Sequence, residues 1–498
     1  MTSFGMSLSQ ILPVSNLSTL VLHVASITVA VFSFPYKRSS SSTLQPAMEP
    51  AAAGALYAAE NLLEGAAALI KGITHPTLPI KANLTRITSA PVPRAHHTVS
   101  VLKGRAYIFG GEIEPGKLAD NGMHVVILPS SGVLEADYTT FPARAANGLD
   151  DVPSSRKGHT STVIGDSIYI FGGEGGNVSE EKGRVWAYHT VQNTWTYLDP
   201  TSDTLYPSQR TGHAAASSDF PGPKTVTYQE KAPQAPVDPS KFVPEPAESD
   251  SWGTIFVVGG RNVTTGQLSN DALAFDVKTR TWTNIPTPSG QPRDGASLAL
   301  VGDRLYRFGG KGVETFSSGA TELLDASHVW KHAEGGTTPL TSGWSWEELP
   351  HTEKAATTAA APQARSNSGL VGVTTGQGRR YLLAIGGESE NSGFLDDIWA
   401  LQLPPESSTA ASTKDSIRAT MKRDTHESQW AEVLYKHVDT RGEEEKEVPG
   451  EPKRGLGARG HFAVAKGTEV DGATAVVWGG EDANGQILSD GWMITVDR

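Results

Sequence analysis

Four histidines stand at similar places in the chain and could together hold a metal ion. Each begins a short apolar stretch: His97, His159, His213 and His461. Neutral imidazole is a good ligand for transition metals, so imidazoles gathered at one place would suggest a metal site. The alternative is that these histidines make hydrogen bonds in the core. We favour the second interpretation because the residue recurs with a repeat unit of the chain.

Six charged residues each follow a Gly-Gly doublet directly. The acidic ones are Glu112, Glu174, Glu388 and Glu481, and the basic ones are Arg261 and Lys311. Gathered around one opening, they would form a charged rim that is acidic on four copies and basic on two neighbouring ones, and such a rim can orient a protein partner. The alternative is that these charges pair with the arginines that precede the doublets.

The composition excludes several kinds of chemistry. The 498 residues include no cysteine, which excludes disulfides, thiolate zinc sites and cysteine nucleophiles. The formal net charge of -12 argues against nucleic acid as a partner. A chain without disulfides suits a reducing compartment, so we expect a cytoplasmic protein.

The elements that must position these residues recur six times. Each copy is a short apolar stretch that ends in a doublet: Gly110-Gly111, Gly172-Gly173, Gly259-Gly260, Gly309-Gly310, Gly386-Gly387 and Gly479-Gly480. One arginine precedes each doublet: Arg94, Arg156, Arg210, Arg293, Arg365 and Arg459. An aromatic residue and a tryptophan follow in some copies, as with Tyr188 and Trp195. An equivalent residue in every copy indicates a structural role for the arginines and glycines.

This arrangement resembles the Kelch repeat, and the resemblance covers roughly residues 80–498. It implies an all-β fold: a six-bladed β-propeller with four antiparallel strands per blade. One such sheet cannot bury both of its faces alone, and radial packing buries each face against the next blade. The chain is thus similar to free-standing Kelch proteins of the fungal or plant type.

The last copy ends at 492–496, before a fourth strand. The stretch 81–89 precedes Arg94 as other fourth strands precede their arginines. We therefore predict that 81–89 completes the last blade and that the propeller spans 79–498. Long insertions at 219–253, 331–343 and 405–428 are expected as loops on one face of the ring.

Two segments precede the propeller. We expect 1–47 to be a disordered or targeting extension, or a gene-model extension, with a membrane anchor only if the apolar stretch 17–34 is retained. Over 48–78, leucines and isoleucine recur every seven residues, which predicts one amphipathic helix and a linker.

Two enzyme families share the fold that the resemblance implies. Galactose oxidase needs a tyrosine cross-linked to a cysteine, which a chain without cysteine cannot form. The nitrile-specifier proteins act with ferrous iron and carry the motif Glu-x3-Asp-x3-His. The nearest match here is Glu322, Asp325 and His328, spaced two and two instead of three and three.

We therefore expect a monomeric, non-catalytic scaffold without a cofactor, which presents the loops of a Kelch β-propeller to a protein partner. The alternative is a lyase of the specifier type, assisted by ferrous iron, that acts at the mouth of the central channel.

Overall fold

The computed structural model describes residues 75–87, 91–129, 137–148, 151–201, 206–222, 252–317, 319–333, 343–349, 361–438, 456–467 and 473–497. The predicted extension at 1–47 and the predicted helix within 48–78 lie outside these residues, apart from 75–78. The chain forms two compact units. One is Leu78–Thr409 with His426–Arg498, and the other is Met1–Thr77 with Ala410–Thr425.

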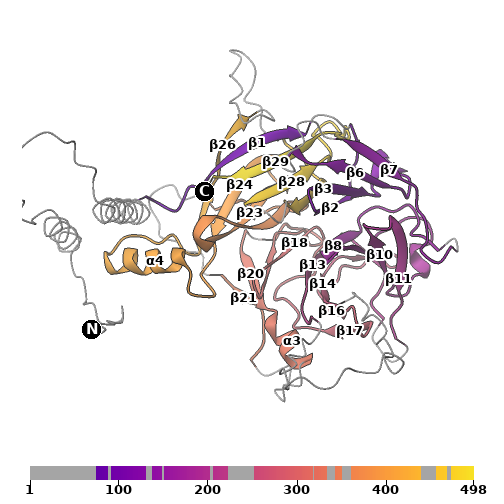
Figure 1. Cartoon of the computed structure of the whole chain (residues 1–498), viewed down its shortest axis with the longest axis horizontal. Helices are drawn as coiled ribbons and strands as arrows, with labels where there is room; N and C mark the ends of the chain where they lie inside the picture. Colours follow the sequence, from indigo (N-terminus) through magenta and orange to yellow (C-terminus); the bar gives the residue numbers. More distant parts are fainter. Residues whose placement is uncertain are drawn as a thin grey trace, which may run out of the picture. The chain divides into compact units, whose positions relative to one another are not determined.

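The larger unit is a six-bladed β-propeller, as predicted (Figure 1). Each blade is a sheet of antiparallel strands, and its first strand lies nearest the centre of the ring. Blade one is β2 (Thr98–Leu102), β3 (Arg105–Phe109), β6 (Met123–Ile127) and β7 (Tyr138–Phe141). Blade two is β8 (Thr160–Ile164), β9 (Ser167–Phe171), β10 (Val185–His189) and β11 (Thr194–Leu198). Blade three is β13 (Ala214–Ser218), β14 (Thr254–Val258), β16 (Ala272–Asp276) and β17 (Thr281–Asn284).

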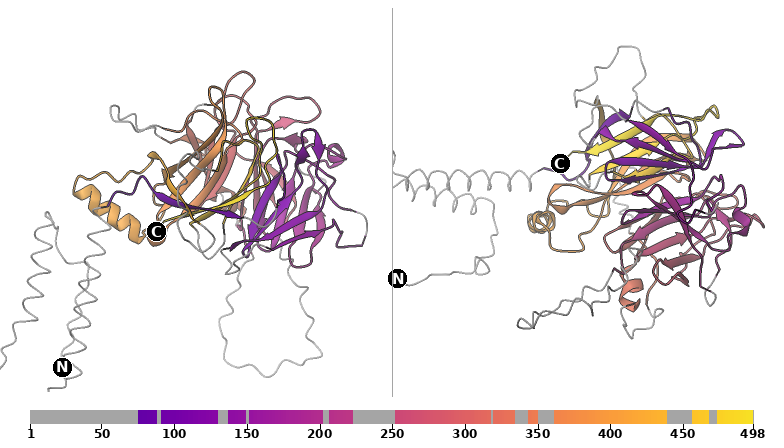
Figure 2. Two further views of the ribbon diagram at one scale, coloured as in Figure 1. Left: turned by 90° about the horizontal axis from the view of Figure 1, so that it is seen from above. Right: turned by 45° about the vertical axis from the view of Figure 1, so that its right-hand side comes forward.

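The other three blades follow the same order, and Figure 2 gives two further views of the sheets. Blade four is β18 (Ser297–Val301), β19 (Arg304–Phe308), β20 (Thr321–Asp325) and β21 (Glu347–Glu348). Blade five is β22 (Gly369–Thr374), β23 (Arg380–Ser389), β24 (Gly393–Gln402) and β25 (Trp430–Glu432). Blade six is β27 (Ala463–Lys466), β28 (Thr474–Trp478), β29 (Gly491–Val496) and β1 (Lys81–Ile87).

The strand β1 closes the ring, which confirms the predicted closure. It pairs antiparallel with β29, in a register that sets Ala82 opposite Val496 and Ile87 opposite Gly491. A further strand, β26 (Leu434–Val438), pairs parallel with the outer edge of β1. This fifth strand was not predicted, and it covers a sheet edge that would otherwise be unpaired.

The core lies between neighbouring blades. The phenylalanine that ends the second strand of one blade packs on the tryptophan in the fourth strand of the next. Ring centroids are 5.1 Å apart for Phe109 and Trp195, and 4.9 Å apart for Phe171 and Trp282. Because these large rings fill the space between sheets, the recurring tryptophan joins one blade to another.

The Gly-Gly doublets are needed where neighbouring blades approach closely. At Gly172, φ is +67°, and an added Cβ would lie 2.7 Å from both the carbonyl oxygen of Arg210 and the Cε1 atom of His213. Any larger residue would therefore collide with blade three.

Short elements lie outside the blades. They are β4 (Glu112–Glu114), β5 (Lys117–Leu118), β12 (Arg210–Thr211), β15 (Arg261–Asn262), α3 (Ser327–Ala333), α4 (Ala410–Thr420) and two 3-10 turns, Val178–Glu180 and Gly376–Gly378. The insertion 405–428 was expected as a loop, yet it contains α4. Its sequence lacks the apolar periodicity that signals a helix, and polar contacts within its own unit hold it, such as Arg418 Nη2 to the carbonyl of His75 at 2.8 Å.

Among the described helices, none is long and apolar enough to cross a membrane.

Candidate functional site

The six repeat arginines lie in the interior of the propeller, each against a carboxylate in or just before the third strand of its own blade. The pairs are Arg94 with Asp120, Arg156 with Glu181, Arg210 with Asp271, Arg293 with Glu322, Arg365 with Asp397 and Arg459 with Asp490. Several arginines also donate to the first glycine of the doublet, as Arg365 does to the carbonyl of Gly386 at 3.0 Å. These contacts tie the second and third strands of a blade together.

The six charged residues after the doublets occupy one equivalent position. Each pairs with the residue that follows the arginine, as Ala95 does with Glu112 and Thr211 with Arg261. Contrary to the alternative expectation, the ion pairs that they form within the described residues are not with the six arginines. Lys157 Nζ lies 2.7 Å from a Glu112 oxygen and 3.5 Å from Glu174, and Arg261 lies 2.7 Å from Asp294. The role of the rim in binding a partner stays a prediction.

Three of the four predicted histidines share one position, three residues after the repeat arginine. They are His97, His159 and His213, and all are buried. Two of them link neighbouring blades through Nε2: His159 with the hydroxyl of Thr98 at 3.0 Å, and His213 with that of Thr160 at 2.8 Å. Burial lowers the pKa of His213 to about 3, so this imidazole is neutral at pH 7.

The fourth histidine was placed in the wrong register. His461 follows Arg459 by two residues, and its equivalent in blade one is His96, which was not among the predicted site residues. Counting the residues between each repeat arginine and the following histidine would have placed His96 and His461 at the same position. The matching residues of the other blades are Gly158, Gly212, Gly295 and Asn367.

These six residues, which we call the mouth ring, surround the channel. All have positive φ, between 50° and 63°. Backbone amides join them from blade to blade: His96 donates to the carbonyl of His461 at 2.8 Å, and Asn367 donates to that of Gly295 at 2.7 Å. A cavity of about 410 Å³ inside the ring is lined by residues from all six blades.

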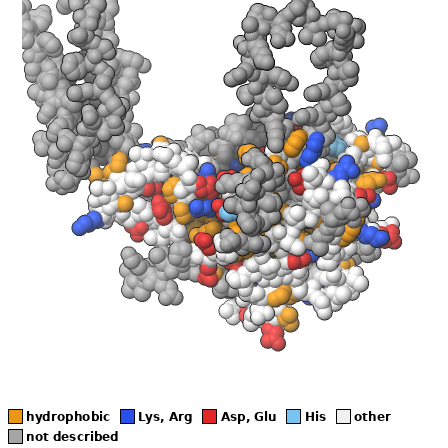
Figure 3. Space-filling model, turned by 90° about the horizontal axis from the view of Figure 1, so that it is seen from below, with side chains coloured by type: hydrophobic (Ala, Val, Ile, Leu, Met, Phe, Trp, Pro, Cys, Tyr) orange, Lys and Arg blue, Asp and Glu red, His pale blue; other side chains and the backbone are white. Residues whose placement is uncertain are grey.

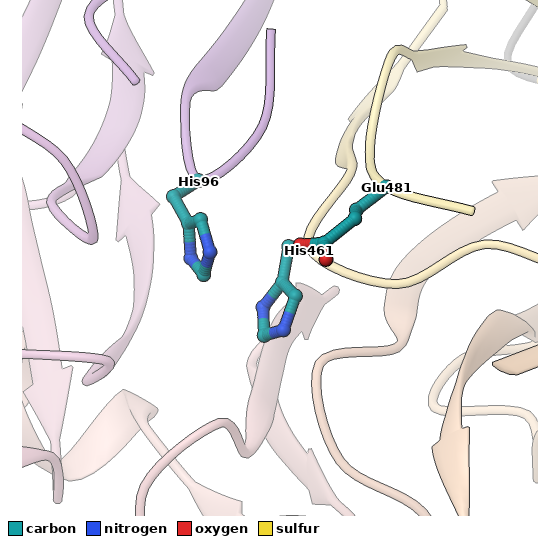
Figure 4. Close-up of side chains that lie close together, drawn as sticks. All are labelled: His96, His461 and Glu481. Atoms are coloured by element: carbon teal, nitrogen blue, oxygen red, sulfur yellow. The ribbon is translucent and has the colours of Figure 1, made fainter. Parts of the chain in front are cut away.

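His96 and His461 bring their side chains together at this mouth (Figure 4). The two imidazole rings stack with centroids 4.0 Å apart. One carboxylate oxygen of Glu481 and one nitrogen of each imidazole all lie within 4.8 Å of one another. Burial, together with the charges of His461 and Lys157, lowers the pKa of His96 to about 3. Burial also lowers the pKa of His461.

A second feature is a groove on the rim of blades three and four, with a volume of about 1100 Å³. Its wall includes Arg261, Leu268, Val313 and Phe316. Val313 is 87% exposed, the highest value among the large exposed hydrophobic side chains of the described residues. Figure 3 views the molecule from below, and the apolar side chains visible on that face are scattered among charged ones.

Two arginines share one carboxylate at the groove. Arg293 and Glu322 both line it, and the fully buried Arg307 lies 3.5 Å from the same Glu322 carboxylate. Arg307 also donates to Asn270 Oδ1 at 3.1 Å. Burial and the charge of Arg293 lower the pKa of Arg307 to about 9, so it stays charged at pH 7. Arg293, Arg307 and Glu322 by themselves carry one surplus positive charge, and the carboxylates of Glu314 and Glu348 also line the groove.

The sequence contained the signal for this surplus charge. Arg307 stands two residues before its doublet, where the other five copies carry an apolar residue: Ile108, Ile170, Val257, Ala384 and Val477. A charged residue at a position that is otherwise apolar requires a neutralising partner, and the sequence prediction assigned none to Arg307.

The three residues matched to the iron motif do not converge. Glu322 pairs with Arg293. Asp325 is the last residue of the strand β20 and lies about 10 Å from Glu322 along that strand. His328 lies 3.9 Å from Asp325, and its ring stacks on Trp344 with centroids 5.2 Å apart. Because three residues of extended strand separate Glu322 from Asp325, Glu322 lies apart from Asp325 and His328.

Comparisons with known families identify Kelch repeats. The model of the KLHDC2/KLHL20/DRC7 Kelch-repeats domain matches residues 83–220, and that of the Kelch motif matches residues 253–289.

Relatives include an N-(sulfonatooxy)prop-2-enimidothioate sulfolyase from Thlaspi arvense. It is 25% identical over 302 residues, which cover 51% of this chain and 83% of the relative. The tRNA wybutosine-synthesizing protein 2/3/4 of Oryza sativa subsp. japonica is 34% identical over 128 residues, covering 26% of this chain and 10% of that protein. Kelch domain-containing protein 3 of Bos taurus is 27% identical over 189 residues, which cover 35% of this chain and 40% of that protein. Among solved structures, that of YjhT aligns with a TM-score of 0.46 and 15% identity, covering 83% of this chain and 99% of that one.

Proposed function

Because the chain carries Kelch repeats and folds as a six-bladed β-propeller, we propose that it is a scaffold that binds a protein partner and does not catalyse a reaction. Kelch propellers in general bind proteins, and the repeat supplies a rigid ring from which loops project. The fold alone does not select a site, so the proposal rests on the groove of blades three and four.

The groove combines the two kinds of contact that a protein segment needs. Val313 and Phe316 offer apolar surface. Arg261 and Arg293 line the groove as cationic contacts, beside the carboxylates of Glu314, Glu322 and Glu348. Its volume of about 1100 Å³ exceeds that of most small-molecule sites, which is roughly 300–1,000 Å³. We infer that an extended segment binds here, with an apolar residue against Val313 and a carboxylate near the arginines.

The charged rim supports the same orientation. Arg261 and Lys311 stand on the two blades that carry the groove, and glutamates occupy the equivalent position on the other four. A rim with opposite charges on its two sides favours one approach of a charged partner and speeds association. We infer that the charged rim around the channel mouth steers the partner, and that the groove, which Arg261 lines, supplies most of the affinity.

The test is affinity capture with the full chain as bait, followed by mass spectrometry of the retained proteins. The change Val313→Asp puts a negative charge where we place the apolar contact and the carboxylate of the partner, so it should abolish retention of a stoichiometric partner. The matched control is Val191→Asp. Val191 is 67% exposed in the turn between β10 and β11, on the face opposite the doublets.

A partner that Val313→Asp retains in full, but that is lost when the loops of the opposite face are changed, would contradict the groove. The absence of any stoichiometric partner would contradict the scaffold proposal itself. A partner that depends on Val313 would next be shortened to find its acidic segment, and replacing the acidic residues of that segment should weaken binding by about tenfold or more.

A further inference from the structure

We propose that His96, His461 and Glu481 form a binding site for a divalent transition metal ion at the channel mouth. The site lies on blades one and six and goes beyond the proposed protein binding, which uses blades three and four. The side chains come from two turns far apart in the sequence, and the closure of the ring by blade six brings them together (Figure 4).

The first observation is that the two histidines stand at positions that disfavour them. Every residue of the mouth ring is left-handed, and three of the six are glycine. A left-handed conformation costs a residue with a Cβ about 1–2 kcal/mol. His96 and His461 adopt it with φ of 53° and 54°. Strained residues that persist in a structure occur often at functional sites, and here both strained imidazoles point to the same place.

The second observation is the set of donors. Two imidazole nitrogens and one carboxylate oxygen leave further coordination positions open to water or a ligand, as in catalytic zinc sites and in non-haem iron sites. Imidazole suits Zn²⁺ and Fe²⁺ and is a poor ligand for Ca²⁺ and Mg²⁺. The cavity of the mouth gives the ion an entry path on the side of the imidazoles.

The third observation is the surrounding charge. Three carboxylates act on His461 through space: Glu481, Glu388 and Glu112. The nearby Lys157 is already held by Glu112 and Glu174. No ion-pair or hydrogen-bond partner is found for the Glu481 side chain within the described part of the chain. This half of the mouth therefore attracts cations and keeps one carboxylate available as a ligand.

Binding requires only a small adjustment. Donors in a tetrahedral site with bonds near 2.1 Å lie about 3.4 Å apart, and here they lie within 4.8 Å of one another. All three side chains are half-buried, and the two histidines line the cavity. Rotation about the side-chain bonds can therefore close this gap without moving the strands.

The experiment measures Zn²⁺ binding to the untagged full chain by titration calorimetry, after treatment with a chelator. Wild-type protein should bind a single ion at this site, and an excess of Ca²⁺ should not compete. Co²⁺ serves as a second probe, because its absorption spectrum reports coordination by nitrogen and oxygen. The changes His96→Gly and Glu481→Gln should each weaken Zn²⁺ binding by roughly tenfold or more.

Two matched controls separate ligation from structural effects. Asn367→Gly relieves the same left-handed strain in the mouth ring without removing an imidazole, and Glu174→Gln removes a carboxylate from the equivalent position of blade two. Both should bind Zn²⁺ like the wild type. Circular dichroism would confirm that each variant is folded.

Absence of Zn²⁺ binding, or equal affinity in wild type, His96→Gly and Glu481→Gln, would overturn the proposal. Val313→Asp distinguishes this proposal from the groove, because it should leave the Zn²⁺ affinity unchanged even if it abolishes partner binding.

Discussion

Two regions of the channel mouth share the same backbone conformation but carry side chains of opposite charge at equivalent positions. In blades one and six, the mouth ring carries imidazoles and the position after the doublet carries glutamate. In blades three and four, the ring carries glycine, and the position after the doublet carries arginine or lysine. We propose a cation site in the first half and a site for an acidic segment in the second. The comparison directs the search for functional residues to departures from the repeat, because the residues shared by all blades hold the ring together.

The largest expected effect tests whether the surplus charge in blade four is real. Glu322→Gln leaves Arg293 and Arg307 without their shared carboxylate, so it should lower the free energy of unfolding by about 3–5 kcal/mol. Arg307→Val restores the one-to-one pairing of the other blades and should stay within about 1 kcal/mol of the wild type. Urea unfolding measures both. If the two variants lowered the free energy of unfolding equally, Arg307 would be a structural part of the core.

A second prediction concerns the buried His213, which links blades two and three. The pKa of His213 lies near 3 in the folded protein and about 6.5 when unfolded. Its contribution to stability is therefore present above about pH 6.5 and is lost as the pH falls, by about 1.4 kcal/mol per pH unit.

Urea unfolding between pH 7 and pH 4 checks this dependence. The variant His213→Gln should show a shallower decline than the wild type. Thr160→Val removes the same interblade hydrogen bond but no titrating group, so it should keep the wild-type slope. Identical slopes for wild type and His213→Gln would contradict the assignment.

The smallest effect concerns strain in the mouth ring. His96→Gly should stabilise the metal-free protein by up to about 1 kcal/mol, because glycine tolerates φ of 53°. Gly212→Ala should destabilise it by about 1 kcal/mol, since φ is +62° and an added Cβ would lie 3.3 Å from the Cβ of Asp294. Thermal unfolding in the presence of a chelator measures both changes. A marked loss of stability in His96→Gly would mean that its imidazole serves the fold.

Much of the fold could be predicted because the signals were local and repeated. Doublets and arginines marked all six blades, and the missing last strand located β1 near the start of the propeller. The strand β26 was missed because it is an extra strand outside the four-strand repeat, so no equivalent stretch in another blade predicts its pairing with β1. The helix α4 was missed because polar contacts, not an apolar face, accompany it.

The candidate sites were harder to predict than the blades. The position of the charged rim followed from the repeat, whereas the register of His461 depended on counting from Arg459. The partnership of His96 with His461 arises only after blade six closes against blade one. The sequence shows Arg307 at a position that is apolar in the other blades. Its sharing of the Glu322 carboxylate with Arg293 depends on the packing of the blade and could not be predicted.

The amino-acid sequence by itself determined the number of blades, the place of closure and the absence of cysteine chemistry, since each depends on residue identity and spacing. The tertiary structure alone decided which charges meet and which imidazoles share one opening. The physical reason is that strand formation responds to neighbours within a few residues, whereas burial and ion pairing depend on side chains that the ring gathers from distant blades.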